Sequence, residues 1–222
     1  MGSYFEITHI TQKKYRVSPH DGTRFDGNIL LKDTCIGNTI NESIWDIYNP
    51  DADVAAFALE GGEIRLKSLT GGPTTSFYRN FIATKLGFEN GIWRFSSNQI
   101  IPINTAGYIW YGLRNFAAGN NVDIFQKSGT VKLSYRVMVG NVVVYQVDNI
   151  TADFLIVKFV IDSSGISAYR WSGLSWSQIG VTQNLDLGEL KLFAAVRGGV
   201  LMEGSIRDIY ITDKDYATSK PE

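Results

Sequence analysis

The chain has 222 residues, of which 21 are basic and 22 are acidic, so its net charge is close to zero. This balance argues against a large basic surface for nucleic acid, and no apolar run is long enough to insert into a membrane as a helix. The single cysteine, Cys35, excludes an intrachain disulfide and predicts a small buried side chain.

The first 25 residues are set apart from the rest by the polar, glycine-containing stretch SPHDGTRFDGN. Within this N-terminal arm (residues 1–25), the segments YFEITHI and KKYRV have the composition of strands. Two interpretations stay open: the arm pairs with the edge of the protein's own sheet, or it docks on a neighbouring subunit and supports an oligomer or particle. The arm lacks the apolar stretch of a secretion signal, so no signal peptide is expected in this chain.

The body, residues 26–213, consists of short apolar clusters that are rich in β-branched and aromatic residues and are closed by Gly, Asn, Asp or Ser. This pattern is typical of an all-β domain, and strands without helices must close as a barrel or as two packed sheets. Residues 214–222 form a C-terminal tail. The predicted strands cover 55–59, 63–66, 76–85, 91–97, 108–114, 122–126, 131–139, 142–147, 154–162, 165–171, 176–179, 190–196 and 204–211.

Two of these segments differ in their hydrophobic pattern. Residues 131–137 alternate between apolar and polar side chains, which predicts a strand with one buried face and one wet face. Residues 154–161 are apolar nearly throughout, which predicts a strand that is covered on both faces.

Three segments follow one another along the chain: LKDTCIGNTINESIWDIYNP, which contains Trp45, then FALEGGEIRLKS, and later EGSIRDIYIT. In order and spacing they resemble the opening strand, the hairpin and the closing strand of the concanavalin-type jelly roll of legume lectins, laminin-G-like modules and laminarinase-like glucanases. The resemblance implies a β-sandwich of two antiparallel sheets.

The stretch NVDIFQ is aligned by this resemblance with the active strand E-x-D-x-x-E of the glucanases, in which the first Glu is the nucleophile and the last is the general acid and base. The corresponding positions here are Asn121, Asp123 and Gln126. A carboxamide neither forms a stable glycosyl ester nor donates a proton near neutral pH. A plain half-buried strand is the alternative interpretation, and a β-bulge would be needed to bring Gln126 to the face of the other two. Both interpretations predict no catalytic residues and no enzyme.

Aromatic residues suggest a binding face instead. In GYIWYGLRN (107–115), Tyr108, Trp110 and Gly112 share one face of the predicted strand. On the concave sheet of such a sandwich, aromatic rings stack on sugars while Asn, Asp and Arg bind hydroxyl groups. The predicted glycan-binding residues are Tyr108, Trp110, Arg114, Asn121, Asp123 and Trp171. The alternative for the aromatic residues is that they belong to the core.

A calcium ion is suggested by the resemblance to lectins, with Asp26 near the start of the body and Asp208 in the last strand as candidate ligands. The simpler interpretation is that Asp26 belongs to an Asp-Gly turn and Asp208 to the surface. No other cofactor is expected, because the two histidines have no cysteine-rich partner and no phosphate-binding loop is present.

The sequence therefore predicts a non-catalytic binding or structural module on an extracellular or virion surface. Two versions stay open: recognition of a cell-surface glycan, and a virus or phage decoration protein whose arm contacts a neighbouring subunit. A glycoside hydrolase that acts on β-glucans with a non-standard active site is the remaining alternative.

Overall fold

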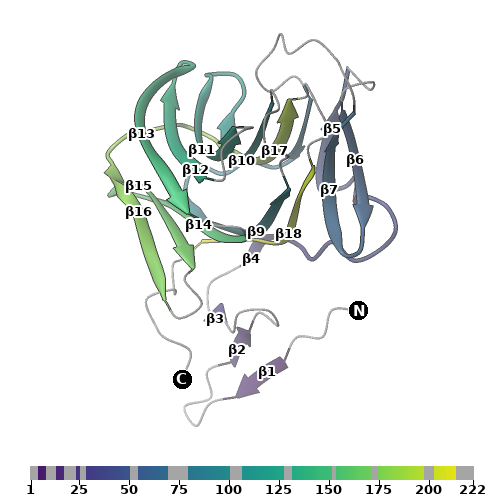
Figure 1. Ribbon diagram of the computed structural model, residues 1–222. Helices are drawn as coiled ribbons and strands as arrows, with labels where there is room; N and C mark the ends of the chain where they lie inside the picture. Colours follow the sequence, from purple (N-terminus) through teal and green to yellow (C-terminus); the bar gives the residue numbers. More distant parts are fainter. Residues whose placement is uncertain are drawn as a thin grey trace.

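A computed structural model of the chain describes residues 5–8, 14–17, 24–25, 29–50, 55–69, 80–100, 107–127, 132–151, 154–171, 175–197 and 203–213. These residues form strands and connecting turns, and no helix in this part of the chain is long and apolar enough to cross a membrane. Two large antiparallel sheets lie one above the other (Figure 1). The predicted all-β sandwich is confirmed.

The first layer is a seven-stranded antiparallel sheet, which we call the upper sheet from its place in Figure 1. Its order begins at one edge with a run of hairpin-connected strands and ends with strands from distant parts of the chain. The strands in this order are β13 (Val142–Thr151), β12 (Lys132–Val139), β11 (Asn120–Lys127), β10 (Tyr108–Asn115), β17 (Lys191–Arg197), β8 (Phe81–Thr84) and β5 (Trp45–Tyr48).

The second layer is an eight-stranded sheet, the lower sheet of Figure 1. Seven of its strands follow the order β16 (Trp176–Gln183), β15 (Gly165–Trp171), β14 (Phe154–Asp162), β9 (Gly91–Ile100), β18 (Glu203–Thr212), β7 (Glu63–Ser68) and β6 (Ala55–Glu60). The last, β4 (Ile29–Asp33), pairs with the end of β18, whereas β7 pairs with its beginning. The register of β18 against β9 shifts between Arg207 and Tyr210, where Asp208 has a φ of 51°.

The core fills the space between the two sheets. Phe95 of the lower sheet contacts Tyr111 of the upper sheet, with ring centroids 6.3 Å apart, and also Phe159 beside it, at 6.0 Å. All three rings are fully buried. Burial of side chains of this size contributes about 1.5–3 kcal/mol each, so these contacts hold the two layers together.

The opening segment of the body is fixed by Asp33 at the end of β4. Its carboxylate accepts hydrogen bonds from the backbone N–H of Cys35, at 2.8 Å, and from the indole N–H of Trp45, at 2.6 Å. Trp45 and Cys35 are both 2% exposed, so the prediction of a small buried cysteine is confirmed. Burial, with a smaller contribution from the Asp33 carboxylate, raises the pKa of the Cys35 thiol, which makes it unreactive.

Every strand that the sequence predicted within the body is present, although residues 76–79 of one predicted strand and residue 131 of another lie outside the described residues. The hydrophobic pattern of 154–161 is confirmed, because β14 lies between β9 and β15 and both Phe159 and Val160, on opposite faces, are buried. The hydrophobic pattern did not mark the short strands β4 and β5, because their apolar runs are brief and are interrupted by polar residues. Both overlap the segment that the family resemblance indicated as an opening strand.

The N-terminal arm forms a separate antiparallel sheet of β1 (Phe5–Thr8), β2 (Lys14–Val17) and β3 (Arg24–Phe25). Among the described strands, these three pair with one another and with neither sheet of the sandwich. Docking of the arm on a neighbouring subunit stays a prediction.

Candidate functional site

The outer face of the upper sheet, which points away from the core, carries the candidate site. Along β10, Ile109, Tyr111 and Leu113 point into the core, whereas Tyr108 and Trp110 belong to a separate cluster on the other side. The predicted division of this strand into two faces is therefore confirmed.

Aromatic rings cover much of this outer face. Tyr108 stacks on Trp110, with ring centroids 5.1 Å apart and planes at 13°, and Phe116 stacks on Phe81 at 4.7 Å. Because Trp110 is 0% exposed while Tyr108 is half-buried, the indole forms the base of the cluster and cannot itself receive a sugar ring in this conformation. The other members of the aromatic cluster are Tyr48, Phe125 and Phe193.

A chain of polar side chains crosses the same face beside these rings. Asn121 Nδ2 donates a hydrogen bond to Asp123 Oδ2 within β11, and Arg136 of β12 donates to the same carboxylate through Nη2 at 2.8 Å and Nε at 3.2 Å. Arg114 of β10 donates to the side-chain oxygens of Asn121, at 3.0 Å, and Asn141, at 2.9 Å. Hydrogen bonds thus link five side chains from three strands and one turn. Two of them carry a guanidinium group, and one carries a carboxylate.

This polar chain is buried. Asn121 and Asp123 are 0% exposed, Arg136 is 6% and Arg114 is 8% exposed. Buried charges are tolerated only when they are paired and hydrogen-bonded. The arrangement around Asp123 meets this requirement, and the guanidinium of Arg136 also lies 4.6 Å from the centre of the Phe125 ring.

Gly112 provides the space in which the Asp123 side chain lies. The two residues are paired across β10 and β11, and a Cβ at position 112 would lie 2.2 Å from the carbonyl oxygen of Val122 and 2.8 Å from the Cβ of Asp123. Only glycine therefore fits at this position without separating the strands.

Gln126 lies on the opposite face of β11 from Asn121 and Asp123. Residues 121–126 pair without interruption with both β10 and β12, so the β-bulge that would turn Gln126 toward the site is absent from this strand. Of the two interpretations of NVDIFQ, the regular strand agrees with this geometry. A glucanase-type pair of groups at positions 121 and 126 is not formed.

Trp171 is not part of this face. It lies on β15 in the lower sheet, where it makes an edge-to-face contact with Trp176 at 5.4 Å. The Nζ of the buried Lys158 lies 4.9 Å from the Trp176 ring and 4.5 Å from the Tyr169 ring. The predicted binding residues therefore divide between the two sheets.

Of the two candidate calcium ligands, Asp26 lies outside the described residues. Asp208 is 5% exposed, and one of its carboxylate oxygens lies 3.7 Å from Arg207 Nε. Among the described residues there is no group of three or more His, Cys, Asp or Glu side chains that could hold a metal ion. Asp208 alone does not constitute a site, and calcium stays a prediction.

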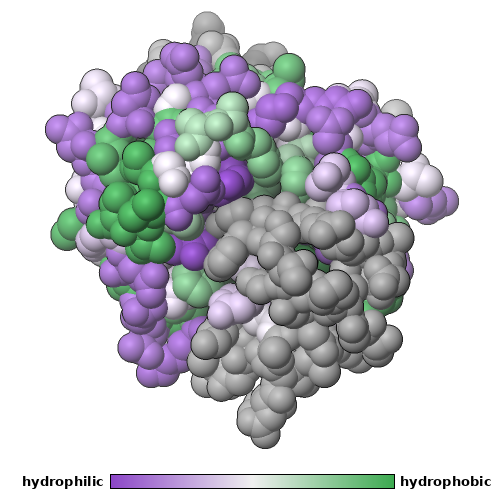
Figure 2. Space-filling view, turned by 90° about the horizontal axis from the view of Figure 1, so that it is seen from above, coloured by the Kyte–Doolittle hydropathy of each residue, from purple (hydrophilic) through white to green (hydrophobic). Residues whose placement is uncertain are grey.

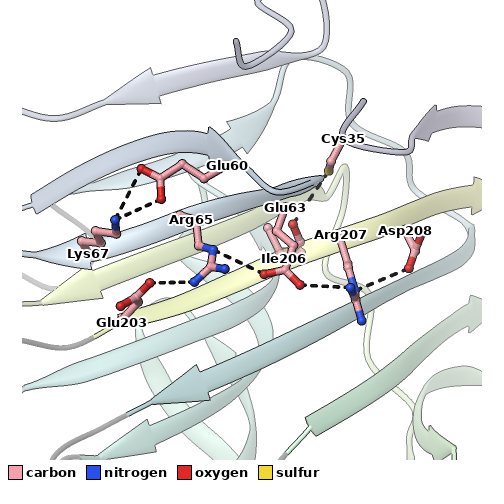
Figure 3. A network of polar contacts seen from close by, with 9 residues as sticks. All are labelled: Cys35, Glu60, Glu63, Arg65, Lys67, Glu203, Ile206, Arg207 and Asp208. Carbon is pink, nitrogen blue, oxygen red and sulfur yellow. Dashed lines mark hydrogen bonds and ion pairs between the residues drawn. The ribbon is translucent and has the colours of Figure 1, made fainter. Parts of the chain in front are cut away.

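Figure 3 shows a second polar network, on the outer face of the lower sheet. Glu63 lies between Arg65, at 3.4 Å, and Arg207, at 3.1 Å, and Arg65 also contacts Glu203 at 2.7 Å. These acidic groups are paired with basic ones across β7 and β18, so the network ties two strands together and presents no isolated reactive group.

The sequence did not indicate three members of the site: Arg136, Asn141 and the ring of Phe125. The alternation of residues 131–137 correctly placed Arg136 on the face away from the core, but the prediction that this face is wet was wrong at Arg136, which is 6% exposed. The alternation could not show that Asp123 would be the opposite residue on the neighbouring strand, because alternation identifies a face and not a partner.

We compared the chain with known proteins at three levels. No protein-family model matches the sequence, and no curated protein matches it. Solved structures do match. One, from a study of endo-acting O-glycanases with which human gut bacteria initiate mucin breakdown, has a TM-score of 0.63 at 12% identity, covering 85% of this chain and 100% of the other.

Two further matches are glucanases. A prokaryotic β-1,3-1,4-glucanase (lichenase) from a mouse hindgut metagenome has a TM-score of 0.63 at 11% identity, covering 83% of this chain and 99% of the other. The catalytic domain of an endo-1,3-β-glucanase (laminarinase) from Thermotoga petrophila has a TM-score of 0.61 at 13% identity, covering 86% and 99%. The chain has the concanavalin A-like jelly-roll fold. The resemblance seen in the sequence is thereby confirmed at the level of the fold.

These matches correct one expectation. The amides at positions 121 and 126 led us to expect a protein without enzymatic activity, whereas the three matched structures described above come from work on O-glycanases, from a lichenase and from a laminarinase. The expectation was wrong because it treated one strand motif as the only route to activity on this fold. None of these three matches supports a role in a virus or phage particle. What they share is that their names refer to enzymes that act on glycans.

Proposed function

We propose that the protein is a glycoside hydrolase that binds a glycan across the outer face of the upper sheet and uses a carboxyl arrangement other than E-x-D-x-x-E. The fold supports this proposal, because the three solved structures described above, which share it, come from work on O-glycanases, from a lichenase and from a laminarinase. The composition of the face supports it too, since aromatic rings adjoin amide, guanidinium and carboxylate groups that bind sugar hydroxyls.

The observation that carries the proposal is the position of Asp123. Among the residues of β10, β11, β12 and β17, Asp123 is the only one with a carboxyl group, and it lies on the outer face beside the aromatic cluster. Hydrogen bonds from Asn121 and Arg136 favour its carboxylate form. Asp123 is therefore suited to act as a nucleophile or to stabilise positive charge on the sugar ring, and not to donate a proton.

Proton donation must come from another group. Gln126 has no acidic proton and points into the core side of the sheet. Retaining hydrolysis needs a second carboxyl about 5–5.5 Å from the first, and inverting hydrolysis one about 6.5–9.5 Å away. Because Asp123 is fully buried, a substrate also reaches it only after neighbouring side chains move apart.

Reducing-sugar release tests this function. Purified protein is incubated with mixed-linkage β-1,3-1,4-glucan, β-1,3-glucan and O-glycosylated mucin. The Asp123→Asn variant is compared with Asp148→Asn, a matched change of an exposed aspartate on β13 in the same sheet. We expect Asp123→Asn to lower the rate by a factor of about 100 or more and Asp148→Asn to leave it unchanged.

Circular dichroism of each sample must first show that the variant is folded. Absence of product from all three substrates with the unmodified protein would contradict the proposed activity. Full activity in folded Asp123→Asn would contradict the assignment of the site.

A further inference from the structure

The strand β13 is an exposed edge of the sandwich. It is the terminal strand of the upper sheet, and β12 is its only neighbour among the described strands. Its ten residues contain one charged side chain, Asp148, and no lysine, arginine or proline. An edge of this kind presents unpaired backbone N–H and C=O groups on which another strand can form.

Apolar side chains surround this edge. Val142, Val143 and Val144 are 64%, 44% and 49% exposed, and Val181 of β16 is 60% exposed. Tyr145 connects the two strands, because its hydroxyl accepts a hydrogen bond from the backbone N–H of Val181 at 3.1 Å. We call the four exposed valines, Val142–Val144 and Val181, the valine patch. Hydrophobic atoms gather on the left of Figure 2, the side on which Figure 1 places β13 and β16.

The edges formed by β5, β6 and β16 differ from β13. β5 has only four residues, and its Asp46 lies near Lys85, at 3.7 Å. β6 ends at Glu60, which forms an ion pair with Lys67 at 3.1 Å. β16 is interrupted by Gly180 in a left-handed conformation with a φ of 68°. Short length, charge and irregular backbone are the usual means by which proteins protect sheet edges. The backbone of β13 is also irregular, at Asn149, but its other end combines regular length with three consecutive exposed valines.

We propose that β13 is a self-association surface, on which β13 of a second copy of this chain pairs in antiparallel orientation about a two-fold axis. A strand is complementary to itself in this arrangement, which is the usual geometry of homodimers. Val142–Val144 stand at one end of β13 and Asp148 near the other, so antiparallel pairing sets the Asp148 side chain of each copy against the apolar end of its partner. The two negative charges are thereby kept apart.

The valine side chains contribute most of the contact in this arrangement. The register of β13 against β12 shifts twice, between Leu133 and Tyr135 and between Val137 and Met138, and Asn149 of β13 has a left-handed φ of 66°. Irregularities of this kind increase the local twist of a strand. A continuous ladder along all ten residues is therefore not expected. Burial of three exposed valines in each copy supplies a hydrophobic contribution that is independent of the ladder.

Sedimentation velocity over a range of protein concentrations tests this inference. We expect the unmodified protein to show a monomer–dimer equilibrium, and Val144→Lys to raise the dimer dissociation constant at least tenfold. Ile47→Lys is the matched control, because Ile47 is 46% exposed on β5, the opposite edge of the same sheet. This control should dimerise like the unmodified protein.

A crosslinking measurement keeps the test valid should the lysine variant fail to fold. With Asp148 opposite Val144 of the partner, the two Gln146 residues face each other at the two-fold axis, and Gln146 is exposed. Cys35 is buried, so a cysteine introduced as Gln146→Cys would be the only accessible thiol among the described residues, at a position where a disulfide can close. Under oxidising conditions it should form a disulfide-linked dimer, whereas Ile47→Cys should not. A protein that stays monomeric at every concentration, or a Val144→Lys variant that dimerises normally, would overturn the proposal. The oligomeric state is measured without substrate, so this outcome is independent of any glycosidase activity.

Discussion

The carboxylate of Asp123 and the guanidinium of Arg136 form an ion pair across β11 and β12, with 2.8 Å between Oδ2 and Nη2 and side-chain exposures of 0% and 7%. Removing two charges from water is costly, and the attraction between them offsets this cost only when hydrogen bonds satisfy both groups. Asn121 donates to the carboxylate, and the Phe125 ring covers the guanidinium. The pair is thus part of the folding energetics as well as of the candidate site.

Loss of both partners should therefore cost less than the two single losses added together. We expect Asp123→Asn and Arg136→Gln each to lower the free energy of unfolding by about 3 kcal/mol, because each leaves one buried charge unpaired. The double variant should lose clearly less than the sum of the two. Urea unfolding of all four proteins measures this coupling, and strictly additive losses would show that the two groups do not interact.

Gly112 should be as sensitive as the ion pair that it adjoins. In Gly112→Ala, the new methyl group meets the backbone of Val122 and Asp123 at 2.2–2.8 Å, and that backbone is held by pairing on both sides. We expect a loss of at least about 3 kcal/mol in the free energy of unfolding, as for severe overpacking.

The control for this prediction is Gly61→Ala in the β6–β7 turn. Gly61 has a φ of 62°, but a methyl group added there would have no atom within 4 Å, so only backbone strain of about 1 kcal/mol is expected. Thermal unfolding followed by circular dichroism compares the two variants. Equal losses would show that the close approach of the strands at Gly112 has no energetic weight.

The strands and their faces could be predicted from the sequence because they depend on local alternation. The pattern around Trp110 placed this residue correctly on the outer face of β10, but alternation does not show what lies over a face, and Trp110 proves fully buried. In the same way, Asn121 and Asp123 were recognised as neighbours on one face. Their link to Arg114 and Asn141 depends on the register of three strands, which no local pattern specifies.

Two buried tyrosines in the core provide a comparison of paired and unpaired hydroxyl groups. The hydroxyl of Tyr135 has no hydrogen-bond partner among the residues that the structure describes, whereas that of Tyr111 has one in the backbone of Ser205. We expect Tyr135→Phe to raise the free energy of unfolding by about 1 kcal/mol and Tyr111→Phe to lower it by about 1 kcal/mol. Urea unfolding measures both, and a loss of stability in Tyr135→Phe would show that its hydroxyl is paired.

The same tyrosines should make the protein sensitive to alkaline pH. Burial raises the pKa of Tyr111, Tyr135 and Tyr210 above their ordinary value, so they ionise more readily after unfolding. Their stabilising contribution is complete below about pH 10, the pKa of an unfolded tyrosine, and is lost as the pH rises further. Arg94 acts in the opposite direction, because burial lowers its pKa to about 10, but it is one group against three.

We therefore expect the free energy of unfolding to fall above about pH 10 and tyrosinate absorbance to rise together with unfolding. In Tyr135→Phe this decline should be less steep, and an unchanged slope would show that Tyr135 does not contribute to it.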